Sequence, residues 1–375
     1  MKKKTIATLF VGLENVHLVK DPGMIPFALH KYYDYNAIVP LSSLQDYPYK
    51  DRYFRDIETP VIDDKSGIRD KYMRRLKWLV KNAKRIDLLN VFFFDRWTWI
   101  YIYVYRLLNK KGKVYVHVDT DGNRLLDYQF TSNKLKYFVL RRFLLSDENM
   151  NKTLWGIQNE ENAKKIKGKW PFYNVEYVPD GIYWEQDSLL NYSEKENTII
   201  TVARNGTPQK KTDLLLNGFA CVADEFPTWK LKLIGTVEED FKPFIHKFFM
   251  DNPELKKRVE FIGPIYDRNA LAEKYSKAKV FCLTSSWESF GLVTAEAMSR
   301  GCYVIGSNIP ATAEIVNNGE YGTLFENENL DDFIVKLGNV LRDEEHIKKV
   351  VEKSAKYANI KYKWKNIVKP IDDWM

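Results

Sequence analysis

Cysteine is scarce in this sequence, and its possible metal ligands are not clustered. The 375 residues include only three cysteines, Cys221, Cys282 and Cys302. Because this number is odd and two of the three lie in predicted buried strands, we expect no disulfide framework and a reduced, cytoplasmic protein. Neither the cysteines nor the histidines have the spacing of a metal site. The sequence therefore predicts no bound metal and no cofactor.

Long apolar runs and two common nucleotide-binding motifs are also absent. No segment approaches the ~18 uncharged apolar residues of a membrane span. Residues 1–12 begin with a basic stretch, but their apolar part is only about seven residues long and has no small-residue cleavage site, so we expect a first β-strand. The sequence contains no Gly-x-Gly-x-x-Gly and no Walker A motif, which excludes the usual dinucleotide and ATPase sites.

The net charge of +8 suits a phosphate-bearing substrate, an anionic membrane surface or a nucleic acid. No RNA-binding or helix-turn-helix signature is present, so we expect no nucleic acid partner. Residues 97–108 are rich in aromatic side chains, and residues 133–142 carry four cations and no acid. Together they could lie on the inner face of a membrane. The alternative is that the first packs on a sheet and the second is a solvated helix face.

Strand-like apolar runs alternate with helical stretches along the whole chain. The runs cover residues 5–12, 37–40, 88–94, 114–119, 143–146, 175–179, 198–203, 231–235, 259–263, 280–284 and 303–306. Such alternation predicts an α/β protein with parallel sheets and crossover helices. We expect two Rossmann-like domains that face a central cleft, residues 1–185 and 186–356, with a linker at 186–197. The tail, 357–375, is predicted to be a helix that packs on the first domain or an ordinary amphipathic C-terminal helix.

The most informative segment runs from Ser286 to Glu296. A buried strand precedes it and a helix begins at about Leu292, so a short strand–helix loop lies between two carboxylates, Glu288 and Glu296. In an open α/β sheet this junction binds ligands, and free N–H groups at the helix start favour a phosphate. Gly291 would let the backbone approach a ligand closely. Each carboxylate could hold sugar hydroxyls, as a nucleotide sugar requires; the alternative is two surface acids without a role.

The motifs Glu288-Ser-Phe-Gly-Leu, Glu296-Ala-Met and Gly301-Cys-Tyr-Val-Ile-Gly resemble the donor site of retaining GT-B glycosyltransferases of the family 4 type, glycosyl transferases group 1. The resemblance covers residues 198 to about 325, and the first half only by its organisation. It implies transfer of a hexose from a nucleoside diphosphate sugar, with a UDP-sugar favoured, and with retention. It also implies that Glu288 binds sugar hydroxyls, that Glu296 binds the ribose, and that the backbone from Phe290 to Leu292 meets sugar and phosphate.

Two cations follow the predicted strand 198–203. Arg204 and Lys210 lie at the ligand-facing end of the sheet, where they can neutralise a diphosphate leaving group without a metal. The family has an Arg and a Lys at these positions, usually with Gly after the Lys. Here Lys211 stands in that place, so the phosphate ligand could be either lysine, and position favours Lys210.

Three further segments could contribute to such a donor site, and they match the family to different degrees. The strand and loop 258–266 resemble those beside the nucleobase, which implies that backbone groups around Pro264 and Ile265 read the base edge; the alternative is a plain turn. Residues 310–314 lack the family's glycines, so Glu314 receives no role. In the loop 12–24, Gly23 is the candidate for close backbone approach to donor phosphate or acceptor, or else an ordinary turn residue.

The strand 114–119 ends in polar residues. Alternation places His117, Asp119 and Asp121 on one face. Family members often carry a His at the end of this strand, near the transferred sugar. Asp119 falls nearest that place and His117 two residues earlier, so both are candidate catalytic residues, and a strand-end Asp that caps the next loop is the alternative.

The sequence thus predicts a hexosyltransferase of bacterial-type surface glycan or glycoconjugate synthesis, with a glycan, a lipid-linked molecule or a protein as acceptor. Two other functions remain open. Asp119 and Asp121 could form the metal-binding Asp-x-Asp of a GT-A transferase, which is an unrelated fold. The chain could also be a non-catalytic scaffold subunit of GT-B fold.

Overall fold

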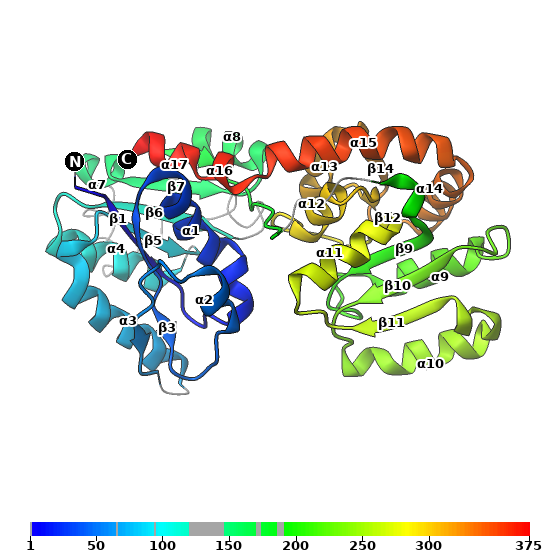
Figure 1. Cartoon of the computed structure of the whole chain (residues 1–375), viewed down its shortest axis with the longest axis horizontal. Coiled ribbons are helices and arrows are strands. Elements are labelled where there is room, and N and C mark those ends of the chain that lie inside the picture. Colours follow the sequence, from blue (N-terminus) through cyan, green and yellow to red (C-terminus); the bar gives the residue numbers. More distant parts are fainter. Residues whose placement is uncertain (1, 65–66, 94, 120–145, 170–173, 186–190) are drawn as a thin grey trace. The chain divides into compact units, whose positions relative to one another are not determined.

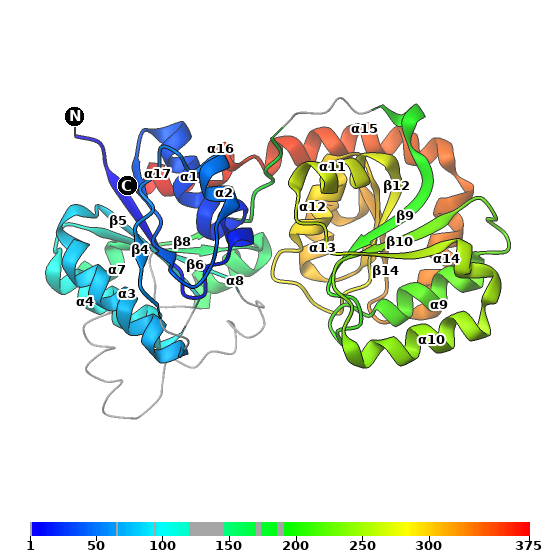
Figure 2. The same cartoon turned by 60° about the horizontal axis from the view of Figure 1, so that its bottom comes forward.

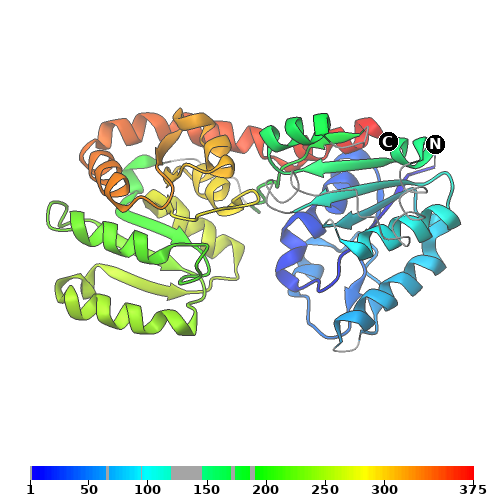
Figure 3. The ribbon, with the colours of Figure 1, turned by 180° about the vertical axis from the view of Figure 1, so that it is seen from behind.

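In the computed structural model, the described residues are 2–64, 67–93, 95–119, 146–169, 174–185 and 191–375. They form two compact units (Figure 1). The first comprises Met1–Gly181 together with Lys363–Met375, and the second comprises Ile182–Tyr362. Each unit contains a six-stranded parallel sheet, as the alternating pattern predicted. Helices lie on both faces of each sheet, as Figures 1 and 3 show from opposite sides.

The helices and strands of the first unit are β1 (Thr5–Leu9), α1 (Asp21–Tyr33), β2 (Asn36–Ile38), β3 (Leu41–Ser42), α2 (Pro48–Tyr53), β4 (Val61–Ile62), α3 (Ile68–Asn82), β5 (Leu88–Phe92), α4 (Arg96–Leu108), β6 (Lys113–Val118), α7 (Asp147–Asn151), β7 (Thr153–Ile157), α8 (Glu160–Lys169), β8 (Val175–Tyr177), α16 (Trp364–Ile367) and α17 (Lys369–Trp374). The large sheet has the order β2-β1-β5-β6-β7-β8, and β3 pairs with β4 separately. Its strands are apolar because both faces are covered.

The aromatic segment 97–108 forms α4. The Asp95 side chain caps this helix by accepting from the backbone N–H groups of Trp97 and Thr98 at 2.8 and 2.9 Å. Tyr101 and Tyr105 are buried in the core of the first unit. This face of the helix therefore packs on the sheet, which is the second of the two alternatives for this segment. The basic segment 133–142 lies outside the described residues.

The end of the chain packs on the first unit through α16 and α17. The Tyr33 hydroxyl donates to the Lys365 carbonyl at 2.8 Å, and the Tyr35 hydroxyl donates to Asp372 Oδ1 at 2.9 Å. Gly181 permits close contact with the Trp364 ring, since a Cβ at position 181 would lie 2.6 Å from it. The long helix α15, by contrast, ends at Lys361 within the second unit.

The helices and strands of the second unit are β9 (Glu196–Val202), α9 (Thr212–Val222), β10 (Lys230–Ile234), α10 (Lys242–Asp251), β11 (Val259–Gly263), α11 (Arg268–Lys277), β12 (Ala278–Leu283), α12 (Leu292–Ser299), β13 (Tyr303–Ser307), α13 (Pro310–Ile315), β14 (Gly322–Phe325), α14 (Leu330–Arg342) and α15 (Glu344–Lys361). Its sheet has the order β11-β10-β9-β12-β13-β14. Strand order therefore reverses between β9 and β12, and ligands bind at such a switch point in doubly wound sheets.

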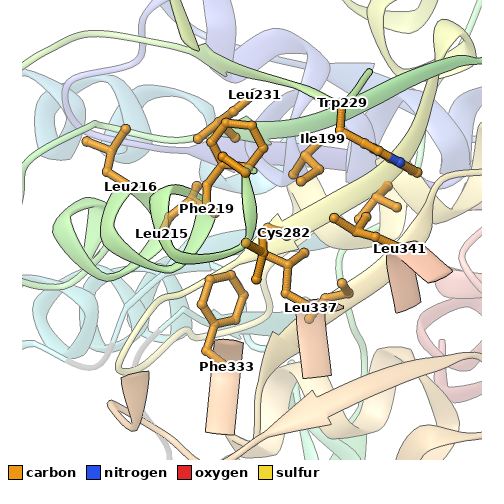
Figure 4. Close-up of a cluster of buried hydrophobic side chains, with 14 of the residues drawn as sticks. Ile199, Leu215, Leu216, Phe219, Trp229, Leu231, Cys282, Phe333, Leu337 and Leu341 are labelled. Atoms are coloured by element: carbon orange, nitrogen blue, oxygen red, sulfur yellow. The ribbon is translucent and has the colours of Figure 1, made fainter. Parts of the chain in front are cut away.

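The core of the second unit is a continuous apolar cluster between the sheet and the helices α9 and α14, which lie side by side (Figure 2). Figure 4 shows Leu216 and Phe219 of α9, Phe333 and Leu337 of α14, and Cys282 of β12 in this cluster. The cluster holds the carboxyl ends of β9 and β12 in a fixed position, and the loops that leave these ends form the site described next.

Two strands of the large sheets have no counterpart among the predicted runs, β7 and β14. Strand β7 has Gly156 as its fourth residue, which interrupts the apolar run. Glycine is needed there because a Cβ would lie 2.2 Å from the Tyr115 hydroxyl of the neighbouring strand. The predicted strand 143–146 falls largely outside the described residues. Among those residues, no helix is long and apolar enough to cross a membrane.

Candidate functional site

The loops that follow β9 and β12 are tied to each other at the switch point of the second sheet. The Ser286 N–H donates to the Gln209 carbonyl at 2.8 Å. The Thr284 hydroxyl donates to the Lys210 carbonyl at 2.9 Å and is 3.1 Å from that of Lys211. The loop with the predicted phosphate ligands thus lies beside the loop with the first predicted carboxylate.

Lys210 and Glu288 form an ion pair in these loops. Lys210 Nζ lies 2.5 Å from Glu288 Oε1, and both side chains are largely buried, with 14% and 10% of their surface exposed. Lys211 has a left-handed backbone, φ 46°, and its ammonium pairs with Glu328 at 2.7 Å instead. Only Lys210, the lysine that its position in the sequence favoured, faces the carboxylate of the motif.

The helix α12 begins directly after Glu288-Ser-Phe-Gly. Gly291 caps it with φ 83°, a conformation that other residues rarely adopt. Phe290 is buried, with its ring 5.4 Å from that of Tyr362, and Leu292 is the first residue of the helix. The fully buried Thr294 hydroxyl, in the first turn, has no hydrogen-bond partner within the described part of the chain. The helix start is thus fixed in position and combines N–H groups with an unpaired hydroxyl.

Glu296 lies in α12 one turn after Leu292, is buried and forms an ion pair with Arg268. Its Oε1 accepts from Arg268 Nη2 at 2.6 Å, while the Tyr275 hydroxyl lies 3.5 Å from Oε2. The side chain of Glu296 is 3% exposed. Burial raises the pKa of Tyr275 well above its usual value, and the Glu296 carboxylate raises it further. The predicted ribose ligand therefore has one oxygen held strongly and the other held weakly.

Arg268 is itself held by an aromatic side chain that the sequence did not single out. Its guanidinium lies 4.3 Å from the centre of the Trp184 ring, and that of Arg300 lies 4.7 Å from it. The Trp184 indole donates to the Ser299 hydroxyl at 2.9 Å. These contacts fix the orientation of Arg268 and, through it, that of Glu296.

The other predicted donor residues of the second unit are more open. Arg204 is exposed in the loop after β9, and no ion pair to it occurs among the described residues. Pro264 is exposed and Ile265 is half-buried, directly after the edge strand β11. Gly263 before them has φ 84°, which turns the chain at this point. These backbone groups remain candidates for contact with a base.

In the first unit, His117 lies in a buried cluster at the carboxyl end of β6. Its Nε2 is 3.4 Å from Asp21 Oδ2 and 3.4 Å from Asp180 Oδ1. Its Nδ1 is 2.8 Å from the Tyr115 hydroxyl, and the Gln158 amide nitrogen is 3.1 Å from Nε2. Asp21 begins α1, Gln158 follows β7 and Asp180 follows β8. Several different elements therefore meet at the carboxyl edge of the first sheet.

The charges in this cluster perturb one another. Burial raises the pKa of Asp21 well above its usual value, and repulsion from Asp180 raises it further. Burial alone would lower the pKa of the fully buried His117, but the carboxylates of Asp180, Asp21 and Asp119 outweigh that effect and raise it. Asp119 is half-buried directly after β6. Asp121, its proposed partner in a GT-A site, lies outside the described residues.

Gly23 lies within α1, so the prediction of a loop at this position was wrong. The glycine is buried in the first turn, and a Cβ there would lie 2.2 Å from the Leu18 carbonyl oxygen. The missing side chain therefore allows α1 to pack against the preceding 3-10 helix, Asn15–Val19. Helix α1 starts earlier than expected because Pro22 is favourable in the first turn of a helix.

Sequence analysis missed Asp21 and Asp180 in the first unit and Arg268 in the second. Asp180 could have been found, since it directly follows a predicted strand, as the residues at ligand edges do. Asp21 stood in the segment assigned to a loop. Nothing local marked Arg268, because its role depends on Trp184 and Glu296, which are distant in the sequence.

The chain is similar to known proteins in part of its sequence and in its fold. Residues 184–357, which lie within the second unit, match the family model described as glycosyl transferases group 1. The sequence is 28% identical over 180 residues to the sulfoquinovosyl transferase SQD2 of Arabidopsis thaliana. This match covers 47% of this chain and 32% of that protein. It is 24% identical over 173 residues to a phosphatidyl-myo-inositol mannosyltransferase of Mycolicibacterium smegmatis. This match covers 45% of this chain and 43% of that protein. The matches thus span less than half the length of these two relatives.

Two solved structures resemble the chain over nearly its whole length. Sucrose-phosphate synthase of Thermosynechococcus elongatus has a TM-score of 0.69 at 16% identity, covering 99% of this chain and 98% of that one. Anabaena Alr3699/HepE, solved in complex with UDP and glucose, has a TM-score of 0.68 at 14% identity, covering 99% of both chains. At these identities the likeness shows the fold, which is the GT-B fold of two Rossmann-like units.

Proposed function

We propose that this protein is a retaining glycosyltransferase of the family 4 type that transfers a hexose from a nucleoside diphosphate sugar, preferably a UDP-sugar, to an acceptor hydroxyl. The observation that carries the proposal is the arrangement of Lys210, Glu288 and Gly291 at the switch point of a group 1 domain. A cation, a carboxylate and a helix N-terminus within two adjoining loops match the charges of a diphosphate joined to a sugar.

The diphosphate would bind at Lys210, Arg204 and the start of α12. As the bond between sugar and phosphate breaks, negative charge grows on the diphosphate, and fixed cations and N–H groups stabilise it. Lys210 is now paired with Glu288. Arrival of the diphosphate would attract the ammonium, and Glu288 would then accept hydrogen bonds from sugar hydroxyls. Because cations of the protein neutralise the phosphate charge, this step needs no metal ion and no cofactor.

Glu296 would bind the ribose. Arg268 holds its Oε1, whereas Oε2 has only the long contact with Tyr275 and can accept from ribose hydroxyls after a small side-chain movement. The backbone of Phe290 to Leu292 would contact the sugar and phosphate, and that of Pro264 and Ile265 the base. Gly23 is not retained as a donor contact, because its close approach is to Leu18.

The first unit would supply Asp119 and His117. A departing diphosphate can itself remove the acceptor proton, so these residues would orient the sugar and stabilise positive charge as it develops. The acceptor would be a glycan, a lipid-linked molecule or a protein of bacterial-type surface glycan synthesis, with the enzyme in the cytoplasm or peripheral at the inner membrane face. The UDP and glucose in the HepE complex support the donor class.

The proposal is tested by screening nucleoside diphosphate sugars for hydrolysis and for thermal stabilisation of the protein. We expect one donor, a UDP-sugar, to raise the melting temperature and to be slowly hydrolysed, with both effects lost in Lys210→Met. Binding without any turnover would favour the scaffold alternative. The GT-A alternative has lost its structural basis, because the fold is that of two Rossmann-like units.

A further inference from the structure

The cluster at the carboxyl edge of the first sheet brings three possible metal ligands to one point. The ring nitrogen of His117 and one carboxylate oxygen each from Asp21 and Asp180 lie within 4.8 Å of one another. The His117 side chain is fully buried, and the two carboxylates are 13% and 14% exposed. Because the ligands come from positions 21, 117 and 180, no sequence spacing could reveal them.

The distances in the cluster fit a bound ion better than hydrogen bonds. Each carboxylate oxygen lies 3.4 Å from His117 Nε2, beyond the ~2.7–3.2 Å of ordinary N–H···O bonds. Two ligand atoms of a tetrahedral zinc ion, with bonds of ~2.0–2.2 Å, are separated by about 3.3–3.6 Å. The two separations from His117 fall in that range, and the two carboxylate oxygens lie within 4.8 Å of each other.

Gln158 offers a candidate fourth ligand beside this cluster. Its amide nitrogen lies 3.1 Å from His117 Nε2 and 2.8 Å from Asp180 Oδ1. The residue is only 3% exposed, and its buried Oε1 has no hydrogen-bond partner among the described residues. Turning the amide over would instead bring Oε1 to the place beside His117 Nε2 and Asp180 Oδ1, where it could act as a fourth ligand of an ion.

The surroundings of His117 are those of a ligand. Metal-bound histidines use the second ring nitrogen to donate a hydrogen bond that fixes the ring. Here Nδ1 lies 2.8 Å from the Tyr115 hydroxyl, whose position depends on the absence of a side chain at Gly156. Among the described residues, His117 is the only cationic partner within ion-pair distance of Asp21 and of Asp180. Two largely buried carboxylates that share a single imidazole partner favour an added cation.

We propose that Asp21, His117 and Asp180 bind one divalent transition-metal ion, best zinc, with Gln158 or water at the fourth position. An imidazole ligand disfavours magnesium and calcium, and carboxylates with imidazole suit zinc. The ion would join the first turn of α1 to the ends of β6 and β8, and so fix the carboxyl edge of the first sheet. The proposed metal site shares His117 with the candidate catalytic residues but none of the phosphate-binding residues, so metal content tests it without reference to sugar transfer.

The test is metal content, measured on the full chain without a metal-binding tag. The protein is stripped with EDTA, equilibrated with excess ZnSO₄, desalted and analysed by atomic emission. We expect about one zinc per chain. Asp21→Asn and Asp180→Asn keep the side-chain shape, and each should lower zinc affinity by more than the ~10–100-fold typical of outer-shell changes. His246→Gln removes an exposed imidazole on α10 and is the matched control, which should retain the zinc.

A second measurement covers the case in which a variant folds poorly. Added ZnSO₄ should raise the melting temperature of the stripped wild type and of His246→Gln, because a ligand that binds only the folded state stabilises it. Added CoCl₂ should give the visible absorption of tetrahedral Co²⁺ in the same two proteins. Absence of stoichiometric zinc in the wild type would overturn the proposal. Zinc that persists in well-folded Asp21→Asn and Asp180→Asn would overturn it as well.

Discussion

Lys210 Nζ lies 2.5 Å from Glu288 Oε1, and this ion pair joins the loops that follow β9 and β12. The second carboxylate of the motif has its own cation, since Arg268 lies 2.6 Å from Glu296. Both carboxylates are therefore held in position by internal partners. The diphosphate of a nucleotide sugar would replace Glu288 as the partner of Lys210, whereas the Arg268–Glu296 pair would stay in place. Substitutions in the two pairs should therefore have different effects on nucleotide binding and turnover.

Replacement of Lys210 should weaken nucleotide binding, whereas replacement of Lys211 should not. Lys210→Met removes a cation from the proposed phosphate site, and loss of a charge-assisted hydrogen bond costs ~1.5–3 kcal/mol, or roughly 10- to 100-fold in affinity. Lys211→Met breaks only the pair with Glu328, on a lysine that is 30% exposed. Calorimetry with UDP compares the two, and equal losses would contradict the assignment of the phosphate ligand.

The two carboxylates should separate binding from turnover. We expect Glu296→Gln to reduce UDP affinity by roughly 10- to 100-fold, because the ribose hydroxyls lose a charged acceptor. Glu288→Gln should leave UDP affinity nearly unchanged and reduce kcat with the UDP-sugar, because it acts on the transferred sugar.

Calorimetry and initial rates measure these two effects. Thermal unfolding of Glu296→Gln is the necessary control, since the substitution also weakens the partner of the buried Arg268. Full affinity and full turnover in both variants would rule out the donor site.

Asp119→Asn should lower kcat far more than it changes donor affinity. The carboxylate is proposed to stabilise positive charge that develops only in the transition state. Rates at saturating donor, compared with calorimetric affinity, measure this separation. His117→Gln has a different expected result, because its ring is fully buried among Tyr115, Gln158 and two carboxylates. It should lower the melting temperature, and wild-type turnover in Asp119→Asn would leave that residue a structural role only.

Chelation should not affect nucleotide binding. If Lys210 and Arg204 neutralise the diphosphate, UDP affinity measured by calorimetry should be the same with and without excess EDTA. Binding that disappears in EDTA and returns with MnCl₂ would mean that a metal ion, not the lysine, meets the phosphates. The same samples report on the first unit separately, because zinc removal there is read from metal content and melting temperature.

Two glycines of the first unit should respond in opposite directions to a methyl group. Gly181→Ala places a Cβ 2.6 Å from the Trp364 ring, so the C-terminal helices must shift, at a cost of ~1–3 kcal/mol. Gly168→Ala, in α8, meets nothing within 4 Å and should stabilise the helix by about 0.5–1 kcal/mol. Chemical denaturation measures both. A Gly181→Ala protein as stable as the wild type would mean that the Trp364 contact is dispensable.

The fold class and the strand–loop–helix structure around Gly291 could be predicted from the sequence because their patterns are local. Apolar runs such as 280–284 must be strands buried on both faces, and a Gly after such a run predicts a loop that turns into a helix. Glu288, Gly291 and Glu296 lie within a few residues of one another, so a single strand–loop–helix unit fixes their relative placement. The prediction for Gly23 was wrong because the sequence does not show that this glycine lies in α1 and packs closely against Leu18.

The partners of these residues were decided by the tertiary structure alone. Lys210 rather than Lys211 faces Glu288 because the left-handed backbone at position 211 points the second lysine toward Glu328. Arg268 reaches Glu296, and Asp21 and Asp180 reach His117, only because parallel strands end at a common edge and bring distant positions together. The local sequence thus determined which segments form strands, loops and helices, and the packing of the sheets determined which charges meet at their carboxyl edges.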